Sequence, residues 1–274
     1  MNKGFVVLAQ NTDQVNYVKC AEALAMSLYN VMPEAHVTLI SDNITSSDYF
    51  DNVVSLPYGD LAKNSDWKLI NDWQVYEASP YEYTIKLEAD LYIPRSIEHW
   101  WEILKPHDLI ISTNIRNFHN ELSNVRAYRR FIDDNKLPDT YNAITYFKKS
   151  DKAKKFFDTV KQIFNDWEQI KSNFKCNPDE KASTDFVYAI AAHIIGEENC
   201  TLPLFKDMSM IHMKQYINNL PSEDWTDIFV YEILPNALRV NTIPQMYPFH
   251  YHAKHFCDTL IKETESWKIK KNTY

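Results

Sequence analysis

Short apolar runs alternate with amphipathic stretches along the first 113 residues, and this alternation limits the folds available to the chain. Residues 5–9 are apolar, apolar positions recur at helical spacing from Val18 to Val31, and residues 37–40 form the next apolar run. A strand, a helix and a strand in this order form a β-α-β unit, in which the two strands are parallel. The sequence therefore predicts an α/β fold with a mostly parallel, twisted sheet flanked by helices.

The second half of the chain contains the clearest helical patterns. An apolar stripe with spacings of three and four runs from Ala153 to Trp167, and an almost wholly apolar helix is expected at residues 186–195, with Ser183 or Thr184 as its cap. No internal repeat, low-complexity segment or linker separates these elements from the first half. We therefore expect residues 1–274 to form a single domain.

Two carboxylates, Glu88 and Asp90, stand one residue apart where the apolar run at residues 83–94 ends. Side chains alternate between the faces of a strand, so these two point the same way, about 7 Å apart along it. Such carboxylates repel each other unless solvent takes both or a cation lies between them. Oxygen ligands of this kind suit Mg²⁺ or Mn²⁺. The alternative is a strand edge with a solvated acidic face.

Glycine is scarce, with three in 274 residues and no two of them close together. A P-loop and a dinucleotide-binding turn both need several glycines, so that the backbone can approach a phosphate group. Both motifs are excluded. If the chain binds phosphates, a metal ion and side chains must hold them.

Composition restricts the class of protein further. The net charge of −8 argues against a protein whose main task is to coat nucleic acid. No apolar run approaches the roughly 20 residues of a membrane span, and the first residues run directly into a strand, so a cytoplasmic protein is predicted. The four scattered cysteines lack a zinc-site spacing and are expected to be reduced thiols.

Four segments in the order 9–17, 79–92, 141–147 and 211–214 together resemble the nucleotide-sugar-dependent glycosyltransferases of the GT-A fold, most closely the family 8 type. The first is similar to the nucleotide-binding loop of that fold, and the second to its metal-binding DxD strand. The third resembles the strand that lines the donor sugar, and the fourth the late His and Lys of the family. The likeness spans roughly residues 5–215.

This chain departs from the family pattern at three positions. Glu88 replaces the first Asp of the DxD motif, Ile144 stands where a glycine is expected, and His212 lacks the full spacing of the family's His and Lys motif. These departures fall in the metal site and the donor pocket of the family, while the resemblance in fold remains.

The resemblance implies a division of the domain and a set of site residues. The nucleotide-binding half would span about residues 1–115. The acceptor half, with a C-terminal closing segment, would span about residues 116–274. The metal, Mn²⁺ or Mg²⁺, would be bound by Glu88, Asp90 and His212. The predicted donor-binding residues are Ala9, Gln10, Asn11, Tyr17, Asp42, Lys86 and Lys214. The residues predicted to act at the reacting sugar are Asp90, Asn142 and Asp185.

Some of these residues have a second interpretation. His212 could equally be a solvent-facing loop histidine, and Asp185 could cap backbone N–H groups at the start of its helix. The histidine-rich segment 247–255 could bind a metal, a phosphate or an acceptor, although a closing strand with two half-buried histidines is the favoured interpretation.

The predicted function is the transfer of a sugar from a nucleoside-diphosphate sugar, by family default a UDP-sugar, to an acceptor hydroxyl. The acceptor could be a carbohydrate, a protein or the hydroxymethylated base of phage DNA, in a bacterial or phage-infected host cytoplasm. A nucleotidyltransferase is disfavoured because the chain lacks a glycine-rich loop after its first strand. The third possibility is a nucleotide-sugar-binding or carbohydrate-binding protein without catalytic activity.

Overall fold

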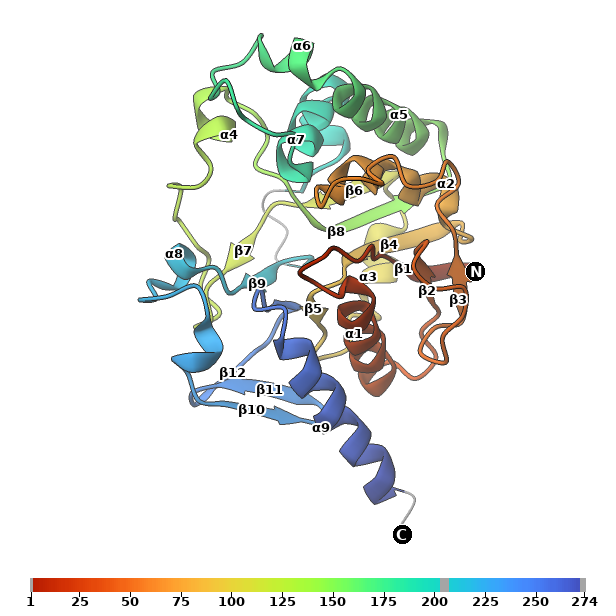
Figure 1. Ribbon diagram of the computed structural model, residues 1–274, viewed down its shortest axis with the longest axis vertical. Helices are drawn as coiled ribbons and strands as arrows, with labels where there is room; N and C mark the ends of the chain where they lie inside the picture. Colours follow the sequence, from red (N-terminus) through yellow and green to blue (C-terminus); the bar gives the residue numbers. More distant parts are fainter. Residues whose placement is uncertain (1, 203–206, 272–274) are drawn as a thin grey trace.

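A six-stranded sheet forms the centre of the computed structural model, which describes residues 2–202 and 207–271 (Figure 1). Its strand order is β3-β2-β1-β4-β8-β6. The strands are β1 (Lys3–Leu8), β2 (Val37–Ile40), β3 (Asn52–Val54), β4 (Tyr83–Glu88), β6 (Leu109–Ser112) and β8 (Tyr141–Lys148). The pairs among β1 to β4 are parallel, whereas β8 is antiparallel to both of its neighbours. The α/β fold predicted from the sequence is confirmed.

Helices cover both faces of this sheet because its strands are apolar on both sides. Phe5 and Val7 of β1 belong to the hydrophobic cluster that includes helix α1 (Tyr17–Val31), while Val6 belongs to the cluster of α5 (Asp151–Asn165) and α7 (Thr184–Ile195). This alternation follows from the two-residue period of a strand. Figure 1 shows α1 and α9 (Phe256–Lys271) packed side by side, away from α5 and α7.

The strand directions bring several chain segments to one edge of the sheet. The parallel strands β1, β2 and β4 end there, and the antiparallel strand β8 begins there, with Tyr141 and Asn142 at its start. Ligands bind at the carboxyl ends of the strands in open sheets of this type. The edge therefore brings the end of β4, with its acidic pair, close to the start of β8.

Two smaller sheets complete the architecture beyond this edge. One has the order β5-β13-β9-β7, and the other has the order β10-β11-β12. Their strands are β5 (Leu91–Tyr92), β7 (Ile115–Arg116), β9 (Met210–His212), β10 (Tyr231–Leu234), β11 (Ala237–Val240), β12 (Ile243–Pro244) and β13 (Phe249–His250). β5 follows the acidic pair at once, so the four-stranded sheet directly continues the site-bearing edge.

The remaining helices are short. They are the α-helices α2 (Val75–Ala78), α3 (Trp100–Leu104), α4 (Arg130–Asp134), α6 (Trp167–Lys171) and α8 (Gln215–Asn218), and the 3-10 helices η1 (Lys68–Gln74), η2 (Glu197–Asn199) and η3 (Trp225–Asp227). None of the helices in the described part of the chain has both the length and the apolarity needed to cross a membrane. The strand β8 lies beyond residue 115 and yet belongs to the main sheet, so both expected halves contribute to it.

Candidate functional site

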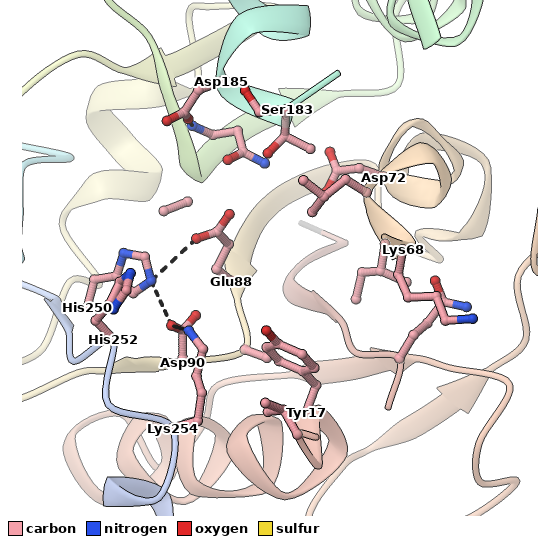
Figure 2. A pocket seen from close by; sticks show the side chains of 18 of the residues that line it. Tyr17, Lys68, Asp72, Glu88, Asp90, Ser183, Asp185, His250, His252 and Lys254 are labelled. Carbon is pink, nitrogen blue, oxygen red and sulfur yellow. Dashed lines mark hydrogen bonds and ion pairs between the residues drawn. The ribbon is translucent and has the colours of Figure 1, made fainter. Parts of the chain in front are cut away.

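A cavity of about 530 Å³ opens at the edge of the main sheet, and the acidic pair lies in its wall (Figure 2). Glu88 ends β4 and Asp90 directly precedes β5, and the side chains of both line the cavity. The Asp90 side chain is almost completely buried, whereas 27% of the Glu88 side chain is exposed. The strand therefore presents both carboxylates to one cavity, as their spacing predicts.

His250, at the end of β13, lies between the two carboxylates. Its Nε2 atom is 2.8 Å from Oδ2 of Asp90 and 3.6 Å from Oε2 of Glu88. Ligand atoms of Glu88, Asp90 and His250 all lie within 4.8 Å of one another. Two carboxylates and one imidazole at this separation are a donor set that suits Mn²⁺ or Mg²⁺.

Lys254 supplies a second positive group to the acidic pair. Its ammonium donates to the same Oδ2 atom of Asp90 that His250 contacts, and only 26% of the lysine side chain is exposed. Burial raises the pKa of Asp90, but His250 and Lys254 outweigh it and hold that pKa well below its usual range. Burial lowers the pKa of Lys254, but Asp90 reverses the effect and raises it. Asp90 and Lys254 thus form a charged pair at neutral pH.

His212 lies beside this cluster rather than in it. Its ring stacks on that of His250 with centroids 4.6 Å apart, and its Nδ1 atom has no hydrogen-bond partner among the described residues. Burial, followed by the nearby His250, lowers the pKa of His212 well below its usual range. The structure places His250, and not the predicted His212, with the two carboxylates. The interpretation of His212 as a solvent-facing loop residue is wrong, since it is a buried strand residue.

Asp185 and Asn142 both line the cavity, and Figure 2 shows Asp185 beside Ser183, apart from His250 and His252. One oxygen of Asp185 accepts from the backbone N–H of Asn142 at 3.2 Å, and the other accepts from the buried guanidinium of Arg129 at 3.0 Å. The side chain of Ser183 caps α7 instead, because it accepts from the N–H of Phe186. Asp185 is therefore held at the cavity by side-chain and strand contacts.

A buried ion pair forms a third part of the wall. The ammonium of Lys86, in β4, is 2.6 Å from Oδ1 of Asp72, and the hydroxyl of Tyr188 donates to Oδ2 of Asp72 at 2.5 Å. Lys86 and Asp72 both line the cavity. The ammonium of Lys86 is therefore fixed in position beside the cavity, with its charge balanced by Asp72.

The predicted donor-binding residues divide into two groups. Gln10, Tyr17, Lys86 and Lys214 line the cavity, whereas Ala9, Asn11 and Asp42 do not. Asn11 instead accepts from the N–H of Val18 and donates its own N–H to Asn43, and Asp42 accepts from the N–H of Leu56. These bonds fix the turns after β1 and β2, so the contribution of Asn11 and Asp42 to the site is to support its loops.

Trp67, Lys68 and Asp72 are cavity residues that sequence reasoning did not single out. His250 and Lys254 also line the cavity; they lie in the histidine-rich segment, for which a metal or phosphate site is the alternative to the favoured closing strand. No sequence signal marks Trp67 or Asp72, whose place in the wall depends on tertiary packing.

Comparison with known proteins finds similarity in structure only. No protein-family model and no curated protein matches the sequence. Among solved structures, the galactosyltransferase LgtC, in complex with donor and acceptor sugar analogs, aligns with 72% of each chain at 11% identity and a TM-score of 0.48. The glycosyltransferase GlyE of Streptococcus pneumoniae TIGR4 aligns with 74% of this chain and 45% of its own length, at 13% identity and a TM-score of 0.42.

Mouse xyloside xylosyltransferase 1 aligns with 74% of this chain and 85% of its own length, at 9% identity and a TM-score of 0.43. All three are glycosyltransferases by name, which is the class of enzyme that the sequence resembles. At these identities and TM-scores we take from them neither a substrate nor a role for any residue.

Proposed function

We propose that this protein is a metal-dependent glycosyltransferase that moves a sugar from a nucleoside-diphosphate sugar to an acceptor hydroxyl. The observation that carries the proposal is the cluster of Glu88, Asp90 and His250 in the wall of a cavity at the carboxyl ends of parallel strands. With three glycines in the chain, neither a P-loop nor a dinucleotide turn is available to bind phosphates. Carboxylates, an imidazole and lysines are the groups that remain for this task.

The donor set fits a divalent cation of the Mn²⁺ or Mg²⁺ type, because it offers two carboxylates from the end of β4 and the residue before β5, and one imidazole from β13, which pairs with β5. Such an ion, when bound, would neutralise charge that develops on the leaving nucleoside diphosphate. Glu88, Asp90 and His250 would hold it. Lys86, which is buried and already oriented, faces the same cavity and favours binding of an anionic donor.

Asp185 and Asn142 are the residues we assign to the reacting sugar. They come from different elements, α7 and β8, and are joined by a direct hydrogen bond at the cavity wall. Arg129 fixes the second oxygen of Asp185, so the orientation of this carboxylate does not depend on substrate. A carboxylate so oriented can accept a hydrogen bond from a sugar or acceptor hydroxyl.

The first test is the release of nucleoside diphosphate from UDP-sugars in the presence of Mn²⁺. We expect slow hydrolysis by the unmodified protein and a loss of about 100-fold or more in Asp90→Asn and His250→Asn, since a cation that stabilises the leaving group contributes several kcal/mol. Asp158→Asn removes an exposed carboxylate of α5 and should leave the rate unchanged. A fully active Asp90→Asn protein contradicts the proposal, and release of pyrophosphate indicates a nucleotidyltransferase instead.

The second test addresses the substrates. Nucleotide-sugars are screened by thermal shift with and without Mn²⁺. The true donor should raise the unfolding temperature of the protein, because a ligand that binds the native state stabilises that state. Carbohydrate, protein and hydroxymethylated DNA acceptors are then compared with the donor so identified. Binding of the donor that is insensitive to divalent metal favours a binding protein without catalytic activity.

A further inference from the structure

Asp90 is shared between two basic side chains, and only one of them belongs to the proposed metal-binding set. Its Oδ2 atom accepts from His250 Nε2 at 2.8 Å and also from the ammonium of Lys254. Glu88, Asp90 and His250 each offer a lone pair to a metal ion. Lys254 cannot be a ligand while it is charged, because an ammonium group has no lone pair. Lys254 therefore holds an oxygen that the ion needs.

A lysine ammonium and a divalent cation cannot both contact this oxygen. They repel each other, and each needs the oxygen at contact distance. The backbone around Lys254 is anchored, since Tyr251 N–H donates to the Asp90 carbonyl at 3.2 Å and Cys257 N–H donates to the Lys254 carbonyl, also at 3.2 Å. The side chain, by contrast, has a flexible four-carbon stem. Competition at Asp90 is therefore resolved by movement of the Lys254 side chain alone.

Lys254 lines the same cavity as Lys86 and Lys214. An ammonium that leaves Asp90 remains partly buried, so its charge is unfavourable unless another anion lies within its reach. The diphosphate of a donor bound in this cavity provides such an anion.

We propose that Lys254 couples metal binding to donor binding, by occupying Asp90 until the diphosphate of the donor offers it another anionic partner. This inference rests on the proposed function, since it requires Glu88, Asp90 and His250 to bind the metal. It assigns a positioning role to a lysine outside the metal-binding set. It also makes the affinities for metal and for donor mutually dependent, because thermodynamic coupling between two ligands is reciprocal.

The test is the affinity for Mn²⁺, measured by titration with and without UDP in the unmodified protein and in Lys254→Met. Without UDP, Lys254→Met should bind Mn²⁺ about 10- to 100-fold more tightly than the unmodified protein. In the unmodified protein Mn²⁺ must first break the ion pair between Lys254 and Asp90, which is partly buried and therefore stronger than an exposed pair and weaker than a fully buried one. UDP should strengthen Mn²⁺ binding to the unmodified protein, and much less to Lys254→Met. Free UDP binds Mn²⁺ itself, so that affinity is measured in parallel and subtracted.

Lys148→Met is the matched control. It removes a lysine of similar exposure, 30% against 26%, that is paired with Asp108 at 3.3 Å and does not line the cavity. Its affinity for Mn²⁺, with or without UDP, should equal that of the unmodified protein. Lys254→Gln carries the test if Lys254→Met does not fold.

Three results test the inference, and the first two separate it from the function on which it rests. If Lys254→Met and Lys254→Gln bind Mn²⁺ no more tightly than the unmodified protein while Asp90→Asn loses Mn²⁺ binding, the inference is wrong and the metal site stands. If neither the unmodified protein nor Lys254→Met binds Mn²⁺ in the presence of UDP, the metal-dependent function and the inference are both wrong. An increase of less than about threefold on adding UDP to the unmodified protein also overturns the coupling, as it is below the usual range of coupling energies.

Discussion

The buried pair of Lys86 and Asp72 allows a sharp test of how the cavity wall is built. The Lys86 side chain is 1% exposed and that of Asp72 8%, and their charged atoms are 2.6 Å apart. Asp72→Asn keeps the shape of the side chain but leaves the ammonium buried without a countercharge. Removal of one partner from a buried pair costs about 3–5 kcal/mol, a third or more of the stability of many proteins. We expect a loss of this size in the free energy of unfolding.

A double-mutant cycle measured by urea unfolding checks the reasoning. Lys86→Met should also destabilise, whereas Lys86→Met with Asp72→Asn removes both charges and should cost less than the sum of the two single changes, with a coupling energy of about 2 kcal/mol. The double variant should regain much of the stability but not the affinity for UDP, since the proposed anion-binding lysine is gone. A loss below about 1 kcal/mol in Asp72→Asn, or single costs that simply add, would refute the buried-pair account.

Three further substitutions test other parts of the structure by urea unfolding. Gly4→Ala would place a Cβ atom 2.3 Å from the ring of Tyr81, whose hydroxyl is hydrogen-bonded, so a loss of about 1–3 kcal/mol is expected; an unchanged midpoint argues against this close approach. Ser183→Ala removes the cap of α7 and should cost about 1 kcal/mol, while Ser183→Asp should retain the stability. Arg129→Lys removes the guanidinium that donates to both Asp139 and Asp185, and we expect lower stability and slower sugar transfer. If only the stability falls, Asp185 has no part in the reaction.

Much of the fold can be predicted from the sequence because its signals are local. The apolar run of β4, the amphipathic period of α5 and the cap of α7 each lie within one segment, and each is found where the pattern predicts it. The sequence also predicts a helix that begins at residues 94–96 and carries Ile97, Trp100, Trp101 and Leu104, but α3 begins only at Trp100. No side chain caps the start of α3, and without a capping residue the sequence does not indicate where the helix begins.

Contacts between distant segments account for what sequence reasoning missed in the cavity. Lys86 and Asp72 are 14 residues apart and belong to different elements, β4 and η1. Lys86 is predicted at the donor site, but no sequence spacing indicates that Asp72 would be its partner. The pair forms because the edge of the sheet and η1 both border the cavity, and this packing depends on the whole fold.

The position of His250, rather than His212, beside the two carboxylates follows from the order of strands in the four-stranded sheet. β13 pairs with β5 on one side and with β9 on the other, and in this register His250 lies opposite both Leu91 and His212. Leu91 directly follows Asp90, so His250 is one strand from the carboxylates and His212 is two. Neighbouring strands are about 4.8 Å apart, and this spacing is enough to place His250 within reach of the carboxylates and His212 beyond it. The strand that carries His250 comes last in the chain and yet inserts between β5 and β9, an arrangement that sequence order alone does not reveal.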